Sequence, residues 1–142
     1  MKSNIAIIAL LLGLFVLVPA RAGPMEDCTA VRRSQEQAYN DRNWDKLMAM
    51  YTKDVHYFSS VTNEVMIGAD AVRAFFSTAS GNSNLRIGEH SAVQVAPNIV
   101  LCSGYQVVTI ANNQSVLRAT MVLVNDNGNW LTAQAHVSRL PK

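Results

Sequence analysis

Hydrophobic and polar positions follow two different periods along this chain, and the change of period predicts helices first and strands afterwards. Residues 25–40 are rich in Ala, Gln, Glu and Arg and contain no Gly or Pro, which favours a long helix. A second, short helix is predicted over 44–51, with Asn43 as its N-cap. Its apolar positions recur at helical spacing: Trp44, Leu47, Met48 and Tyr51.

After Asp54 the pattern becomes that of short strands. Residues 55–58 are β-branched and aromatic, and together with 65–67 they predict a hairpin. Gly68 ends this hairpin, and 69–78 predicts a third helix. The side chains of that helix expected to face inward are Val72, Phe75 and Phe76.

The rest of the chain alternates between strand patterns and turn residues. Strands are predicted over 85–96, 99–110, 115–124 and 130–139, separated by short segments rich in Asn, Gly and Pro. Each strand leads directly into its neighbour, which indicates an antiparallel meander. Helices followed by such a meander predict an α+β fold with the helices on one face of the sheet.

The N-terminus has the layout of a cleavable signal peptide. Lys2 precedes an apolar run over 5–18, and Ala20-Arg21-Ala22 is a small-x-small site, so cleavage is expected after Ala22. The alternative is a membrane anchor, but a helix of that run covers only about 21 Å, less than the bilayer core needs. We therefore expect residues 1–22 to be a signal peptide, residues 23–142 to form one domain, and the protein to be exported to the periplasm or the medium.

Signal cleavage also changes the charge balance. The whole chain has 12 Lys and Arg against 10 Asp and Glu, a net charge of +2. Loss of Lys2 and Arg21 leaves ten of each sign, so the mature domain is neutral. A neutral domain without a basic stripe is expected to bind neither nucleic acid nor, after cleavage, a membrane surface.

Two cysteines, Cys28 and Cys102, remain in the predicted mature chain. An oxidising compartment favours a disulfide between them, which would tie the N-terminal helix to the sheet. Two buried thiols that never meet are the alternative. Their spacing, without a CxxC motif, indicates neither a redox site nor a zinc site, and the three histidines come from three different strands, so no metal and no cofactor is expected.

The order and spacing of these residues resemble the nuclear-transport-factor-2-like superfamily. The opening similarity lies in 43–45, 51–55, 67–72 and 75–76. The closing stretch of the chain resembles the SgcJ/EcaC-type proteins and the association domain of calcium/calmodulin-dependent protein kinase. This similarity lies in 118–124, Asp126, Gly128, Trp130 and 136–138. The resemblance implies a cystatin-like cone, in which a curved antiparallel sheet wraps around the long helix and leaves an apolar pocket, and it implies a homodimer through the outer face of the sheet.

The superfamily includes ketosteroid isomerase and SnoaL-like cyclases as well as non-catalytic members. The isomerase resemblance places its carboxylate base near Ser59, its tyrosine near Gln35 and its second acid near Thr120. No Asp or Glu lies in 55–63 or in 99–124, so both carboxylates are missing from this chain. The kinase association domain implies a pocket for small carboxylates, with His136 and Ser138 at matching positions. Arg118 is the replacement cation in that interpretation, and a solvated or interface arginine is the alternative.

Strict alternation along 130–139 puts one polar, partly aromatic set of side chains on a single face. The members of this set are Trp130, Thr132, Gln134, His136 and Ser138. We expect Trp130, Gln134 and His136, with Tyr57, Tyr105 and Arg118, to line the ligand pocket. An alternative of equal weight is that His136 lies near the sheet edge, has its hydrogen bonds satisfied within the protein and contacts no ligand.

Three functions remain open on the sequence. The first is an exported, non-catalytic domain that binds a small apolar or carboxylate ligand, and we favour it because the isomerase carboxylates are missing. The second is an isomerase, cyclase or dehydratase acting on a small apolar substrate, with His136 as its acid or base. The third is an interaction or assembly module.

Overall fold

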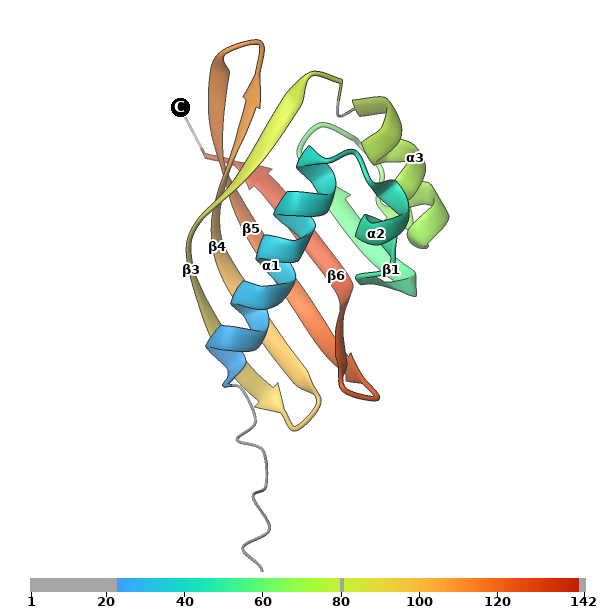
Figure 1. Cartoon of the computed structure of the whole chain (residues 1–142), viewed down its shortest axis with the longest axis vertical. Coiled ribbons are helices and arrows are strands. Elements are labelled where there is room, and N and C mark those ends of the chain that lie inside the picture. The colour runs from blue at the N-terminus through green and yellow to red at the C-terminus, as the bar shows by residue number, and fades with distance from the viewer. Residues whose placement is uncertain (1–22, 80, 141–142) are drawn as a thin grey trace, which may run out of the picture.

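The structure is a computed structural model that describes residues 23–79 and 81–140; the predicted signal peptide lies outside the described residues. Its elements follow the predicted order of helices and then strands (Figure 1). They are α1 (Pro24–Asn40), α2 (Trp44–Met48), β1 (Tyr51–Ser59), β2 (Met66–Ile67), α3 (Ala69–Ala79), β3 (Ser83–Ala96), β4 (Ile99–Ile110), β5 (Asn113–Asp126) and β6 (Asn129–Arg139). The predicted α+β class is confirmed.

The strands form one curved, open sheet in the order β2-β1-β6-β5-β4-β3. Neighbouring strands are antiparallel except β1 and β6, which are parallel and join the first strand of the chain to the last. Helix α1 crosses one face of the sheet, and α2 and α3 lie beside β1 at the end of that face (Figure 1). This is the sheet wrapped around a helix that the resemblance implied.

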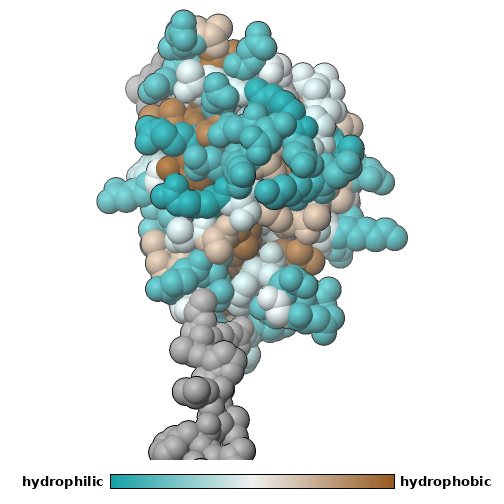
Figure 2. All heavy atoms as spheres, in the orientation of Figure 1, coloured by the Kyte–Doolittle hydropathy of each residue, from teal (hydrophilic) through white to brown (hydrophobic). Residues whose placement is uncertain are grey.

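One face of α1 is buried against the sheet. The buried positions recur at helical spacing and include two polar side chains; they are Cys28, Val31, Arg32, Gln35, Ala38 and Tyr39. The opposite face of α1 is polar, and Figure 2 shows a largely hydrophilic surface on this side of the molecule, with separate small apolar patches. Among the described helices, none has the length and apolar character needed to cross a bilayer.

The second helix is shorter than predicted. Asn43 caps it as expected, because its Oδ1 accepts a hydrogen bond from the Lys46 amide at 3.0 Å. The helix ends at Met48, however, and Tyr51 begins β1 instead of continuing the apolar helical face. The reason lies in the last strand: the amide of Thr132 donates to the Met50 carbonyl oxygen at 2.8 Å, and this contact draws the chain into the sheet.

A disulfide joins Cys28 on α1 to Cys102 on β4, with 6.0 Å between the two Cα atoms. Both residues are fully buried, so the bridge lies within the core. The predicted link between helix and sheet is confirmed. It anchors the N-terminal half of α1 over β4, next to the position of Arg32.

A β-bulge in β6 decides which side chains of this strand face α1. Thr132 pairs with Leu123 and Gln134 pairs with Val122, so Ala133 is an extra residue on β6. The extra residue reverses the alternation of the strand. Thr132 is therefore buried beneath α1, whereas Gln134 is exposed on the outer face.

Candidate functional site

A cavity of about 490 Å³ lies between α1, α3 and the concave face of the sheet. Buried side chains form its closed end, among them Arg32, Gln35 and Ala119. Exposed residues form its mouth: Ser60, Val61, Ile110, Ser115 and Arg139. The predicted hollow between helix and sheet is therefore present, and its size lies in the range of pockets that hold small organic molecules.

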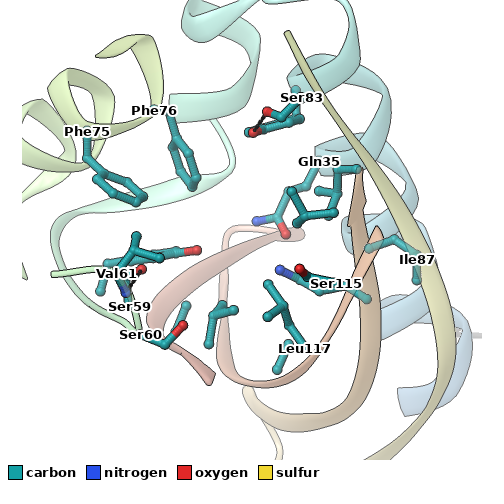
Figure 3. A pocket seen from close by; sticks show the side chains of 18 of the residues that line it. Gln35, Ser59, Ser60, Val61, Phe75, Phe76, Ser83, Ile87, Ser115 and Leu117 are labelled. Atoms are coloured by element: carbon teal, nitrogen blue, oxygen red, sulfur yellow. Dashed lines mark hydrogen bonds between the residues drawn. The ribbon is translucent and has the colours of Figure 1, made fainter. Parts of the chain in front are cut away.

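One wall of the cavity is aromatic. Tyr57 on β1 packs edge-on against Phe76 on α3, with ring centroids 5.3 Å apart, and Tyr39 on α1 packs on the same ring at 5.8 Å. Phe75 lies beside them, and in Figure 3 both phenylalanine rings extend from α3 toward the space above Ser59 and Val61. This wall offers ring faces and edges to an apolar ligand.

The lining of the cavity also contains hydroxyl groups. The Tyr39 hydroxyl lies 2.6 Å from Ser83 Oγ in a buried pair that spans α1 and the start of β3. The Tyr57 phenol is a neutral hydrogen-bonding group, and burial raises its pKa further above the ordinary value. Across the cavity, Ser115 on β5 faces the aromatic wall near Leu117 (Figure 3). The cavity thus combines apolar walls with neutral hydrogen-bonding groups.

Arg32 brings a charge to the closed end. Its side chain is 1% exposed, and its Nη2 donates a hydrogen bond to the Tyr105 carbonyl oxygen at 2.8 Å. Its Nε and Nη1 atoms are buried without a hydrogen-bond partner. Burial lowers the pKa of the guanidinium, and the negative charge of Glu36 partly opposes this shift.

Of the predicted ligand-site residues, Tyr57 alone lines the cavity. Gln134 and His136 follow the bulge in β6 and are exposed on the outer face, where the His136 ring lies 6.0 Å from the ring of Phe58. Tyr105 and Arg118 are also exposed on the outer face, and Arg118 donates to the Arg139 carbonyl oxygen at 3.2 Å. The prediction that these four side chains enter the pocket is wrong.

Trp130 was predicted to face the same pocket and lies elsewhere. It stands before the bulge, on the α1 side of the sheet, and packs against the core. It lines a separate, open depression together with Val31 and Ser34 of α1 and Met50. The even-numbered residues before and after the bulge therefore face opposite sides of the sheet, which strict alternation could not show.

Two of the three positions implied by the isomerase resemblance lie at the cavity. Ser59 and Gln35, at the positions expected for the base and the tyrosine, both line the cavity, whereas Thr120 is exposed on the outer face. The described lining contains no Asp, Glu or His, and its ionisable groups are Arg32, Arg139 and three tyrosines. No cluster of three metal-ligating side chains occurs among the residues that the structure describes.

Sequence reasoning missed Arg32 as a site residue. The signal was present, because Arg32 lies four residues after Cys28 and three before Gln35, on the stripe of α1 that faces the sheet. An arginine on such a stripe is rarely buried without a partner. Its position on the buried stripe of α1 therefore indicated a candidate site residue.

Comparison with known proteins agrees with this architecture. Residues 30–141 match the family model described as a SnoaL-like domain. No curated protein matches the chain. Solved structures give many matches, and three of them illustrate their range.

A protein of Xanthomonas campestris named for the calcium/calmodulin-dependent protein kinase II association domain is 20% identical, with a TM-score of 0.76 over 87% of this chain and 92% of its own. A nuclear-transport-factor-2-like protein of Pseudomonas putida is 17% identical, with a TM-score of 0.71 over 80% and 84%. A ketosteroid isomerase-like protein of Erwinia carotovora is 16% identical, with a TM-score of 0.64 over 83% and 97%. At these identities the likeness shows the fold, which is nuclear-transport-factor-2-like.

Proposed function

The chain belongs to the family of SnoaL-like domains, and on that premise we propose that it binds a small, largely apolar molecule in the cavity between α1 and the sheet. The proposal is one of binding without chemical conversion. Such a fold is compatible with small-molecule binding and with isomerase-type chemistry, so the lining of the cavity has to distinguish the two.

The observation that carries the proposal is a preformed cavity with an aromatic wall and a mostly apolar lining surface. The volume of about 490 Å³ accommodates a molecule of one or two rings. Tyr57, Phe75 and Phe76 provide contact area, and the serine hydroxyls at the mouth leave the entrance polar. Binding here removes apolar surface of the ligand from water, which is the main driving force expected.

The residue chemistry of the described lining favours binding over isomerisation. Proton transfer at a carbon needs a base of suitable pKa within reach of the substrate. The described lining offers hydroxyl, amide and guanidinium groups instead. His136, the acid or base of the enzymatic alternative, is exposed on the other side of the sheet, which leaves that alternative without its central group.

Two neighbouring positions on β5 give a matched test. Ala119 is buried and lines the cavity, whereas Thr120 is exposed on the outer face. The probe is phenylnaphthylamine, a neutral aromatic compound whose fluorescence rises in apolar surroundings. We expect saturable binding of one molecule per chain, a loss of affinity of about tenfold or more in Ala119→Phe because the new ring occupies the cavity, and no loss in Thr120→Phe.

The proposal is overturned if the wild-type chain shows no saturable binding, or if the two variants bind alike. Circular dichroism and urea denaturation of both variants establish that each is folded. A second cavity variant, Ala135→Leu, repeats the test from β6 with a smaller side chain.

We also propose that the domain acts outside the cytoplasm. The signal-peptide pattern of residues 1–22 and the buried disulfide support export. Expression of the full chain in a bacterium, followed by N-terminal sequencing of the periplasmic fraction, should find a chain that begins at Gly23. An uncleaved chain retained in the cytoplasm would contradict export while leaving the cavity proposal intact.

A further inference from the structure

We infer that the ligand of the cavity presents a hydrogen-bond donor, a neutral hydroxyl or N–H group, at the closed end, and that the side-chain oxygen of Gln35 accepts it. This inference rests on the proposed function, because it names the polar group of the molecule that the cavity takes. The residue that carries it is on α1, and its carboxamide extends from the helix into the cavity (Figure 3).

One end of the Gln35 carboxamide is already used within the protein. Its Nε2 donates to Thr132 Oγ1 at 2.9 Å, and both side chains are buried. Because Thr132 holds the nitrogen, the amide cannot exchange its two ends without losing this bond. The oxygen, Oε1, is therefore the atom that the side chain leaves for another partner.

Gln35 Oε1 has no hydrogen-bond partner among the described residues, yet it is not closed off. In that part of the chain, the unpaired polar side-chain atoms without accessible surface belong to Arg32 and Thr52. Gln35 Oε1 is not one of them, so it keeps a surface of its own on a residue that lines the cavity. A side chain that is only 6% exposed thus offers an unused acceptor to the cavity.

A ligand that fills the cavity has to satisfy this oxygen. Water can donate to Oε1 in the empty protein, but an apolar molecule expels that water. Other buried side chains of the lining include Ala119, Met121 and Ala135, which have no donor. An acceptor left unpaired in such surroundings costs free energy, so a ligand that brings a donor to Oε1 binds more tightly than one that does not.

The polarity of this position separates the chain from the isomerase resemblance, which places a tyrosine near Gln35. A phenol can donate a hydrogen bond, whereas the Gln35 oxygen only accepts one. A ligand whose polar group is a ketone would meet Oε1 with a second acceptor, and the two oxygens would repel each other. The ligand class is therefore an alcohol, a phenol or a ring that carries an N–H group.

Gln106 on β4 provides a matched control. It is the same residue type and lines the same cavity, but it is half-buried, and no hydrogen bond to another described residue holds its carboxamide. Its amide can turn either end toward a ligand, so it donates or accepts as the ligand requires. Gln106 is therefore not expected to select for a donor.

The test compares two neutral probes that share one ring system, naphthol and its methyl ether, methoxynaphthalene. Both carry an oxygen that can accept, and only naphthol carries a donor. Isothermal titration at neutral pH measures both on the wild-type chain, Gln35→Met and Gln106→Met. We expect the wild type and Gln106→Met to bind naphthol about tenfold more tightly than the ether, and Gln35→Met to lose most of this preference.

Gln35→Met leaves the Thr132 hydroxyl buried without its donor and can fail to fold for that reason. The double variant Gln35→Met/Thr132→Val removes both partners of the bond, and it replaces the single variant in that case. Circular dichroism establishes that each variant is folded.

Equal affinity of the wild type for the two probes overturns the inference and leaves the cavity proposal standing. The same holds if a folded Gln35 variant keeps the preference for naphthol, or if Gln106→Met loses it to the same extent. Failure of the wild type to bind either probe overturns both.

Discussion

Gln35 and Thr132 are joined by a buried hydrogen bond, in which Gln35 Nε2 donates to Thr132 Oγ1 at 2.9 Å across 97 residues of sequence. The bond connects the middle of α1 to β6 just before the bulge at Ala133. It holds α1 over β6, a strand that lines the cavity. Both side chains are polar and buried, and the bond gives the Thr132 hydroxyl oxygen a donor from the Gln35 amide.

Replacement of Thr132 by Val should lower the free energy of unfolding by about 1–3 kcal/mol, because the isosteric side chain leaves the Gln35 amide buried without its acceptor. Urea denaturation measures the change. Thr120→Val on the exposed face of β5 is the control and should change stability by no more than about 0.5 kcal/mol. An equal effect of the two substitutions would show that the buried bond contributes nothing.

Removal of the disulfide should also destabilise the fold. The bridge closes a loop between residues 74 apart, and its loss in Cys28→Ala/Cys102→Ala should cost roughly 4 kcal/mol, mainly by freeing the unfolded chain. Urea denaturation of the variant gives the difference. A titration of free thiols in the unfolded wild-type protein is the independent check, and two reactive thiols there would contradict the bridge.

Stability should fall at alkaline pH because of the buried tyrosines. Burial raises the pKa of Tyr57 and of Tyr51 above the ordinary value of 10.0. Above about pH 10 the unfolded chain therefore releases phenolic protons that the folded chain retains, and the free energy of unfolding decreases with rising pH. The contribution is fully present below pH 10.

Tyr57→Phe lacks one of the two buried phenols. Its free energy of unfolding should therefore decline less steeply than that of the wild type between about pH 9 and 11. Tyr51→Phe should act in the same direction. Denaturation curves at several pH values in this range provide the comparison. Parallel pH profiles for wild type and Tyr57→Phe would be inconsistent with a phenol that stays protonated in the fold.

Pairing through the outer face of the sheet stays a prediction. Apolar side chains stand exposed there, with Val93 59% and Tyr105 44% accessible. A second copy would cover them. Light scattering should therefore give a dimer for the wild type and a monomer for Val93→Asp/Tyr105→Asp, with Asn127→Asp in the β5–β6 turn as a control that remains dimeric. A monomeric wild type would contradict this prediction.

The elements could be predicted because their signals are local. The helical spacing in α1, the cap at Asn43 and the Asn-rich turns act over a few residues, and they placed β4 and nearly all of α1 where the structure has them. The two cysteines indicated the bridge, although pairing and separate thiols were both open. The end of α2 was misplaced because the contact between Met50 and Thr132, far apart in the chain, ends the helix early.

The site itself depended on information that is not local. An extra residue, Ala133, reverses the facing of β6, and it is defined by the register of the neighbouring strand β5, so alternation alone assigned Gln134 and His136 to the wrong side. Burial of Arg32 likewise depends on how the sheet curves around α1. Periodicity along the chain determined which residues form helices and strands, but only the tertiary structure decided which faces meet, because register and burial are properties of two segments at once.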